Sequence, residues 1–142
     1  MKLEIMPGKS LGRISLGMSK AEIRGILAGP VTSGKQNEYA LRESDSFDLS
    51  GIKIDYDGEG RCEAIEARRP SDPVFQGNSL IGVPRSRAQA LISRLDPMME
   101  IELGCIIWRK LGLTLYFELN DKEEIVETVT VFVQGYYEQY SL

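Results

Sequence analysis

LGMSKAEIRGIL at Leu16–Leu27 recurs as IGVPRSRAQALI at Ile81–Ile92, 65 positions further along the chain. The second residue is glycine in both copies, and the eighth, eleventh and twelfth residues are apolar in both. The offset is close to half of the 142-residue chain, and a repeat of this size is typical of two copies of one supersecondary unit. We therefore predict a single domain over residues 1–142, made of two repeats at about residues 1–70 and 74–142.

Each copy carries the signals of a short amphipathic helix. A capping box, SKAE, begins at Ser19, and a Gly-Pro pair follows the last apolar residue of the pattern. In the second copy Pro84 suits the first helical turn, and an Asp-Pro pair ends the pattern. The spacing predicts helices over Ser19–Ala28 and Arg85–Leu95.

Alternating stretches predict antiparallel hairpins after each helix. Residues 51–57 alternate strictly, a Gly-Glu-Gly turn follows, and residues 61–68 return. The second-half strands are predicted over 101–108, 112–119 and 125–133, with further short strands at Leu3–Met6 and about Tyr39–Arg42. We therefore predict an α+β fold, in which two tandem helix-plus-antiparallel-hairpin repeats form one sheet with both helices on one face and the other face free.

Composition indicates a folded protein of the cell interior. Apolar residues make up 42% of the chain and charged residues 27%. The first residues show no signal-peptide pattern and no apolar run could cross a membrane, so we expect a cytoplasmic protein without membrane contact. A net charge of −4 disfavours nucleic acid and permits a basic protein partner. Cys62 and Cys105, one in each half, are expected to be free thiols.

The absence of histidine limits the chemistry that the chain could perform. Without imidazole there is no Ser-His-Asp triad, no Cys-His pair and no histidine metal ligand, so we expect no catalytic residue and no cofactor. Asp55, Asp57, Glu59, Gly60 and Glu66 do match the spacing of a calcium-binding loop. Their flanks are strand-like and not helical, which favours a hairpin turn, and calcium stays the alternative.

A binding face is the stronger candidate for function. If the strand register is regular, four large side chains share the face of the sheet that carries no helix. These are Ile106, Trp108, Tyr116 and Phe132. Asp55 and Asp57, two positions apart on one strand, would form a charged rim beside these anchors, on the same face as Lys53, Glu66 and Arg68. The alternative is that Trp108 and Phe132 cover a core edge or pack against the tyrosine-rich tail at residues 136–140.

The capped helix and the hairpin after it resemble a known group of bacterial repeats. The stretches that carry the resemblance are PGKSLG at 7–12, LGMSKAEI at 16–23 and IKIDYDGEGR at 52–61. They resemble the repeats of β-lactamase inhibitory protein and of the BamE-type assembly lipoproteins, and some immunity proteins that neutralise contact-delivered toxins. The secreted inhibitor has a disulfide within each repeat and the lipoproteins have a lipidation signal, whereas this chain has one cysteine per half and no such signal.

The resemblance therefore implies a cytoplasmic immunity protein. Such a protein would bind a cognate toxin domain of contact-dependent growth inhibition and block its active site or its access to substrate. Acidic rim residues would suit a basic nuclease domain. Two alternatives stay open: an intracellular binding or scaffold module of the same fold with no toxin partner, and an enzyme that works with carboxylates alone.

Overall fold

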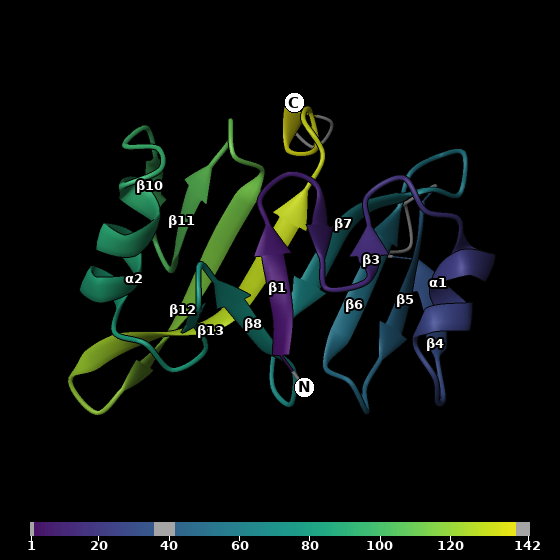
Figure 1. Cartoon of the computed structure of the whole chain (residues 1–142), viewed down its shortest axis with the longest axis horizontal. Helices are drawn as coiled ribbons and strands as arrows, with labels where there is room; N and C mark the ends of the chain where they lie inside the picture. The colour runs from purple at the N-terminus through teal and green to yellow at the C-terminus, as the bar shows by residue number, and fades with distance from the viewer. Residues whose placement is uncertain (1, 36–41, 139–142) are drawn as a thin grey trace.

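The computed structural model describes residues 2–35 and 42–138, and its main element is an eight-stranded antiparallel sheet. The first half supplies β4 (Thr32–Lys35), β5 (Glu43–Phe47), β6 (Ile52–Tyr56) and β7 (Cys62–Ala67). The second half supplies β10 (Glu100–Glu102), β11 (Cys105–Trp108), β12 (Leu113–Asn120) and β13 (Glu123–Phe132). The strand order β10-β11-β12-β13-β7-β6-β5-β4 joins the two halves at β13 and β7 (Figure 1).

A second, smaller sheet lies over the middle of one face of the large sheet (Figure 1). Its strands are β1 (Lys2–Met6), β2 (Ser10–Leu11), β3 (Ile14–Ser15), β8 (Asp72–Phe75) and β9 (Asn78–Ser79), in the order β3-β2-β1-β8-β9. Neighbouring strands are antiparallel except β1 and β8, which run parallel. We call the covered face of the large sheet the inner face and the opposite one the outer face.

The predicted α+β fold class is wrong, because the protein is mostly β, with 48% strand and 13% helix. The sequence prediction placed one short strand near the N-terminus and ended one repeat at about residue 70 and began the next at about residue 74, with no strand between them. Both regions instead form hairpins of the small sheet. Strands β2, β3 and β9 have two residues each and are too short to show an alternating pattern, so of this second layer only β1 was predicted. The inner face is therefore covered by a sheet as well as by helices.

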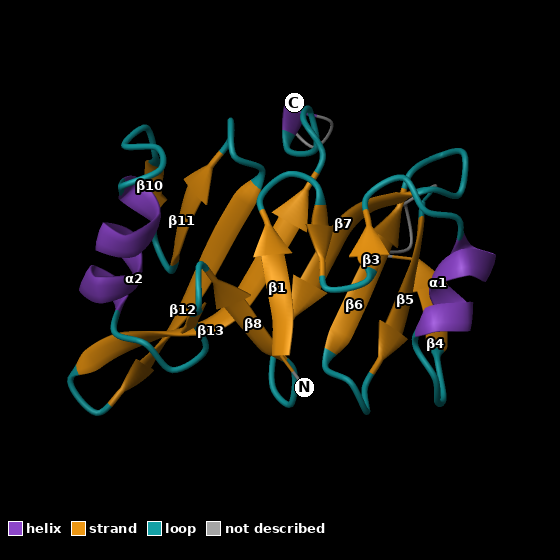
Figure 2. Ribbon diagram, in the orientation of Figure 1, coloured by secondary structure: helices purple, strands orange, loops and turns teal. Residues whose placement is uncertain are grey.

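The two helices that the structure describes lie where the sequence placed them, but each is shorter than predicted. Helix α1 (Lys20–Ile26) has the full capping box at Ser19, and α2 (Arg85–Ser93) has Pro84 at its N-cap without a side-chain hydrogen bond. They stand at the two ends of the large sheet, with the small sheet between them (Figure 2). Each buries only its core-facing residues, so the helices close the ends of the core.

The same backbone contacts recur in the two halves. Gly17 N–H donates to the Cys62 carbonyl at 2.8 Å, and Gly82 N–H donates to the Val126 carbonyl at 2.8 Å. The residue before each helix also forms an isolated bridge to the hairpin after it, as Ser19 with Arg61 and Pro84 with Ile125. Each copy of the repeated stretch is thus fastened to its own hairpin in the same way.

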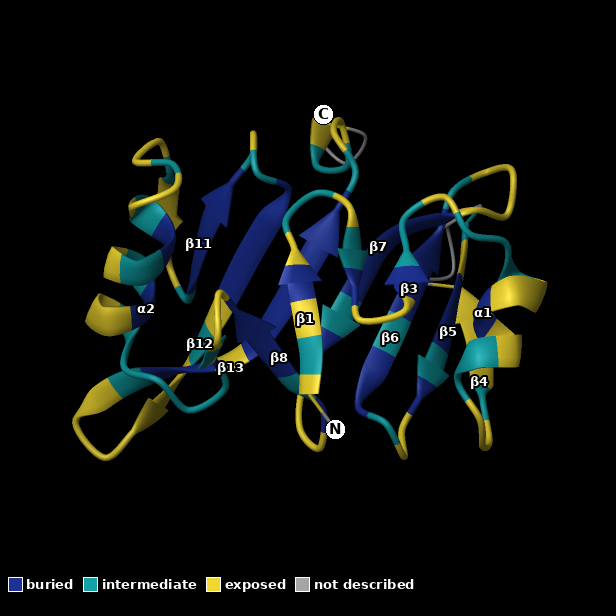
Figure 3. Ribbon diagram, viewed as in Figure 1, coloured by how far each residue is buried: buried dark blue, intermediate teal, exposed yellow. Residues whose placement is uncertain are grey.

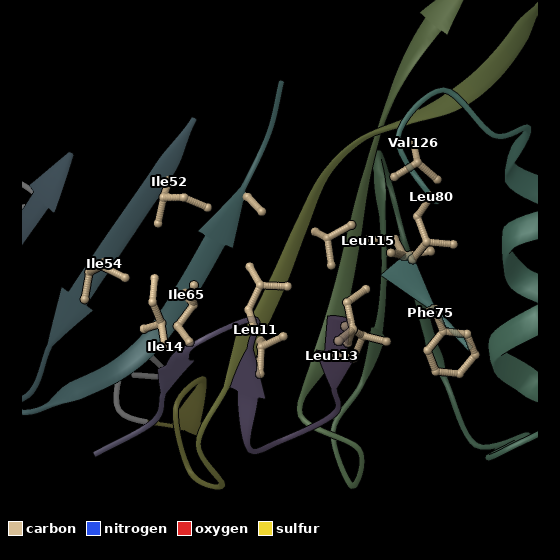
Figure 4. Close-up of a cluster of buried hydrophobic side chains, with 14 of the residues drawn as sticks. Leu11, Ile14, Ile52, Ile54, Ile65, Phe75, Leu80, Leu113, Leu115 and Val126 are labelled. Carbon is tan, nitrogen blue, oxygen red and sulfur yellow. The ribbon is translucent and has the colours of Figure 1, made fainter. Parts of the chain in front are cut away.

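The core lies between the two sheets. Leu11 and Ile14 of the small sheet meet Ile65 and Leu113 of the large one (Figure 4). Strands β6, β7, β11 and β13 of the large sheet are buried along most of their length, while most of β1, the hairpin tips and the helix backs are exposed or partly exposed (Figure 3). Neither helix among the described residues is long and apolar enough to span a membrane.

Two further sequence predictions concern the first half and the cysteines. The strand predicted at about Tyr39–Arg42 falls largely outside the described residues. Residues 55–66 form the end of β6, a turn and most of β7, so a strand flanks each side of the turn, as the sequence favoured. Cys62 and Cys105 are free and buried, and burial raises the pKa of the Cys62 thiol to about 12.

Candidate functional site

Strand pairing identifies the side chains of the outer face. Lys53 of β6 lies opposite Glu66 of β7, Glu66 opposite Thr130 of β13, and Thr130 opposite Thr114 of β12. Residues directly opposite one another share a face, and these alternate with core residues such as Ile65. A polar row therefore crosses the middle of the outer face.

The C-terminal tail covers part of this face. The rings of Tyr136 and Tyr137 pack on Phe132, with centroid distances of 5.8 and 4.9 Å. The Tyr136 hydroxyl donates to Asp55 Oδ2 at 2.7 Å, and the Tyr137 hydroxyl lies 2.8 Å from Thr114 Oγ1. The sequence predicted that the outer face is free, and this prediction is wrong. Tyr136 and Tyr137 form a tyrosine strap that covers the centre of the face.

Beside the strap lies a hollow of about 340 Å³. Its walls include Lys53, Asp55, Glu66 and Tyr116 from the sheet and the two tail tyrosines. Asp55 is 9% exposed, and its Oδ1 atom is buried without a hydrogen-bond donor. The nearest cation, Lys53 Nζ, is 3.9 Å from Oδ1. Buried carboxylate oxygens are normally hydrogen-bonded, so this atom marks the hollow as the candidate site.

The electrostatic character of the outer face beside the hollow is acidic. Glu127 lies near both Glu66 and Glu118, and burial together with the hydrogen bond that the protonated Glu127 carboxyl shares with Glu118 raises the pKa of Glu127. Burial likewise raises the pKa values of Tyr116 and Tyr137, so both phenols are protonated at neutral pH and can donate or accept hydrogen bonds. Such a surface offers many acceptors and aromatic faces to a partner.

The structure corrects the predicted positions of two anchors. Ile106 lies opposite Leu115, and Trp108 opposite Leu113, so both share the inner face with these core residues. Both are fully buried in the main core. The sequence prediction set β11 one residue out of register with β12, and a shift of one residue exchanges the two faces of a strand.

The other predicted site residues are only partly brought together. Phe132 and Tyr116 do lie on the outer face, but Phe132 is buried under the tail, which was the alternative that the sequence left open for it. Tyr116 is 37% exposed and borders the hollow. Asp55 borders it too, whereas Asp57 lies in the turn after β6, where its carboxylate accepts the backbone N–H groups of Glu59 and Arg61. Asp57 is therefore a turn residue.

Sequence reasoning also missed a buried ionic cluster on the inner face, which fastens α1 to β5. Asp45 is fully buried and accepts a bidentate pair of hydrogen bonds from Arg24, at 3.0 and 2.9 Å. Ser33 and Tyr56 donate to the same carboxylate at 2.7 and 2.8 Å. Burial raises the pKa of Asp45, but the hydrogen bonds from Arg24, Ser33 and Tyr56 outweigh it and hold the pKa below its ordinary value.

Replacement of Asp45 by alanine is expected to lower the free energy of unfolding by about 3 kcal/mol at neutral pH, because it breaks the ion pair with Arg24 and leaves the buried Tyr56 hydroxyl without its acceptor. Since the folded-state pKa is depressed, the contribution of Asp45 is present above its ordinary pKa of about 3.9 and is lost as the pH falls through the lower folded value. Urea unfolding of parent and variant at several pH values measures this difference. A gap that stays constant into acid would contradict the assignment, and Asp48→Ala, an exposed neighbour, serves as the control.

Comparison with protein-family models, with characterised proteins and with solved structures finds no match to this chain. Among the described residues, no group of three or more acidic or cysteine side chains is placed to hold a metal ion.

Proposed function

We propose that this chain is an immunity protein that binds a cognate bacterial toxin domain through its outer face and blocks it. The observation that carries the proposal is the hollow beside Asp55, where a buried carboxylate, a partly exposed carboxylate and tyrosine side chains meet on one sheet face. The resemblance of the repeated, capped stretch to immunity proteins supplies the class of partner. Tyrosine within a charged surround is typical of protein-binding surfaces.

The charge of the outer face favours a basic partner. Glu127 is close enough to Glu66 and to Glu118 for both carboxylates to influence it, and the whole chain carries a net charge of −4. Complementary charges raise the association rate and orient the encounter, so a basic nuclease domain is the partner class that this face suits best. Blockage would follow from coverage of the toxin's own cationic substrate-binding surface.

The test is co-expression of the full chain with the product of the adjacent gene. We expect the two proteins to co-elute in size-exclusion chromatography and cells that express both to survive, because the toxin is held inactive. Binding should weaken as salt concentration rises. If the neighbouring product neither binds nor harms cells that lack this chain, the immunity proposal is wrong. Binding without toxicity would instead favour the scaffold alternative.

A further inference from the structure

We propose that the hollow on the outer face receives an arginine side chain of the partner, and that Lys53 occupies its place in the free protein. This inference rests on the proposed function, because the arginine would come from the toxin domain. The site it assigns is the set of groups around Asp55 Oδ1, namely Asp55, Lys53, Glu66 and the tyrosines of the wall.

The first support is the incomplete bonding of Asp55. One carboxylate oxygen, Oδ2, accepts the Tyr136 hydroxyl, while Oδ1 is buried with no donor. Lys53 Nζ at 3.9 Å is an ion-pair partner but lies beyond hydrogen-bond distance. A buried acceptor without a donor raises the free energy of the folded protein. A ligand that brings an N–H group to Oδ1 would therefore gain a hydrogen bond that the free protein lacks.

The second support is the charge of the surrounding groups. Lys53 Nζ is 3.9 Å from Asp55 Oδ1, and Lys53 lies directly opposite Glu66 in the β6–β7 pairing, so Asp55 and Glu66 flank Lys53 on the same face of the sheet. Arg68 is a further cation near this group. Its guanidinium is 3.9 Å from Glu66 and its side chain is about half exposed, so it neutralises Glu66 only weakly. The carboxylates of Asp55 and Glu66 would repel an anionic ligand here. They would attract a cationic ligand that displaced Lys53.

The shape of the groups favours guanidinium over ammonium. Guanidinium is planar, donates in a fixed fork and stacks on aromatic faces, and it is more weakly hydrated than an ammonium ion. The hollow offers carboxylate acceptors together with the rings of Tyr116 and Tyr137. Lys53 interacts only weakly with these groups, since its contact to Asp55 is long and its side chain is about one-third exposed. Displacement of Lys53 into water should therefore cost little.

Two substitutions are predicted to act in opposite directions. Lys53→Met removes the competitor and should tighten binding of a guanidinium probe about threefold to tenfold, and Asp55→Asn should weaken it about tenfold. Glu66→Gln, at a partly exposed position, should weaken binding and keeps the test valid if Asp55→Asn fails to fold. Lys9→Met removes the same charge from an exposed turn of the small sheet and should leave binding unchanged.

The experiment is an amide NMR titration of the full chain with N-acetyl-arginine methylamide, and with the neutral citrulline analogue as the matched control. We expect saturable shifts around Lys53, Asp55 and Tyr116 with arginine, and binding at least about tenfold weaker with citrulline. Equal binding of the two probes, shifts located elsewhere, or no tightening by Lys53→Met relative to Lys9→Met would overturn the inference. Equal binding of the lysine analogue would overturn the preference for guanidinium.

This result is separable from the proposed function. The titration needs no toxin, so it can succeed even if the neighbouring gene product proves not to bind. Conversely, a toxin complex that forms with unchanged affinity in the Asp55→Asn variant would retain the function and refute the arginine site.

Discussion

Replacement of Trp108 by alanine is expected to lower the free energy of unfolding by about 4 kcal/mol, the range typical for loss of a large buried aromatic side chain. Trp108 is fully buried between Leu113 of the neighbouring strand and the rest of the main core. Removal of the indole leaves a void that the two packed sheets cannot close. Urea unfolding followed by circular dichroism measures the loss.

The controls separate core packing from partner contact. Ile101→Ala, on the exposed edge strand β10, should change stability by less than about 1 kcal/mol. Trp108→Phe should cost less than Trp108→Ala, because the phenyl ring refills most of the void. Loss of the indole N–H adds little, since it has no hydrogen-bond partner. A stable Trp108→Ala protein that had lost only its partner would contradict the inner-face position and restore the anchor role that the sequence suggested.

Replacement of Gly112 or Gly51 by alanine is expected to destabilise the fold by about 3 kcal/mol or more. Both glycines have positive φ, 71° and 72°, at the start of a strand. A Cβ atom would lie 2.4 Å from the Phe132 carbonyl oxygen at Gly112, and 2.3 Å from the Arg68 carbonyl oxygen at Gly51. These carbonyls belong to the backbone and cannot move aside as a side chain would.

Gly60→Ala isolates the effect of backbone conformation. Gly60 also has positive φ, 78°, but a Cβ atom there would meet nothing within 4 Å. Its replacement should therefore cost only about 1 kcal/mol. Thermal unfolding of the three variants compares them directly. If Gly60→Ala lowered stability as much as Gly112→Ala, the predicted clash with the Phe132 carbonyl would be contradicted.

Local signals in the sequence located the elements that depend on neighbours along the chain. The capping box at Ser19 fixes the start of α1 through two short-range hydrogen bonds, and both are present. The alternation at Ile52–Tyr56 and the glycine-rich turn after it gave the β6–β7 hairpin. These features need only a few adjacent residues, so a single sequence reveals them.

The features that the sequence did not reveal depend on distant pairing. The parallel contact of β1 with β8 joins residues about 70 positions apart, and two-residue strands such as β2 carry no periodic pattern. The register of β11 on β12 is set by the turn between them, and an error of one residue there moved Trp108 and Ile106 to the wrong face.

The candidate site shows the same division. Asp55 and Tyr116 could be placed on the outer face from strand alternation, and the structure brings both to the hollow. Alternation also placed Lys53 and Glu66 on this face, but the hollow that they border could not be predicted, because it arises only when the tail crosses the sheet and Tyr136 reaches Asp55, 81 positions away. Alternation gave Asp57 the face of Asp55, but its carboxylate serves the turn.

The most direct test of the outer face as the binding surface is calorimetry with the purified toxin domain and two charge-reversal variants. Glu66→Lys alters the hollow, and Glu4→Lys makes the same change on the exposed side of the small sheet. With both variants shown to be folded, we predict that Glu66→Lys weakens binding at least about tenfold and that Glu4→Lys stays within about twofold of the parent. Equal affinities for the two variants, or a larger loss with Glu4→Lys, would contradict the outer-face assignment.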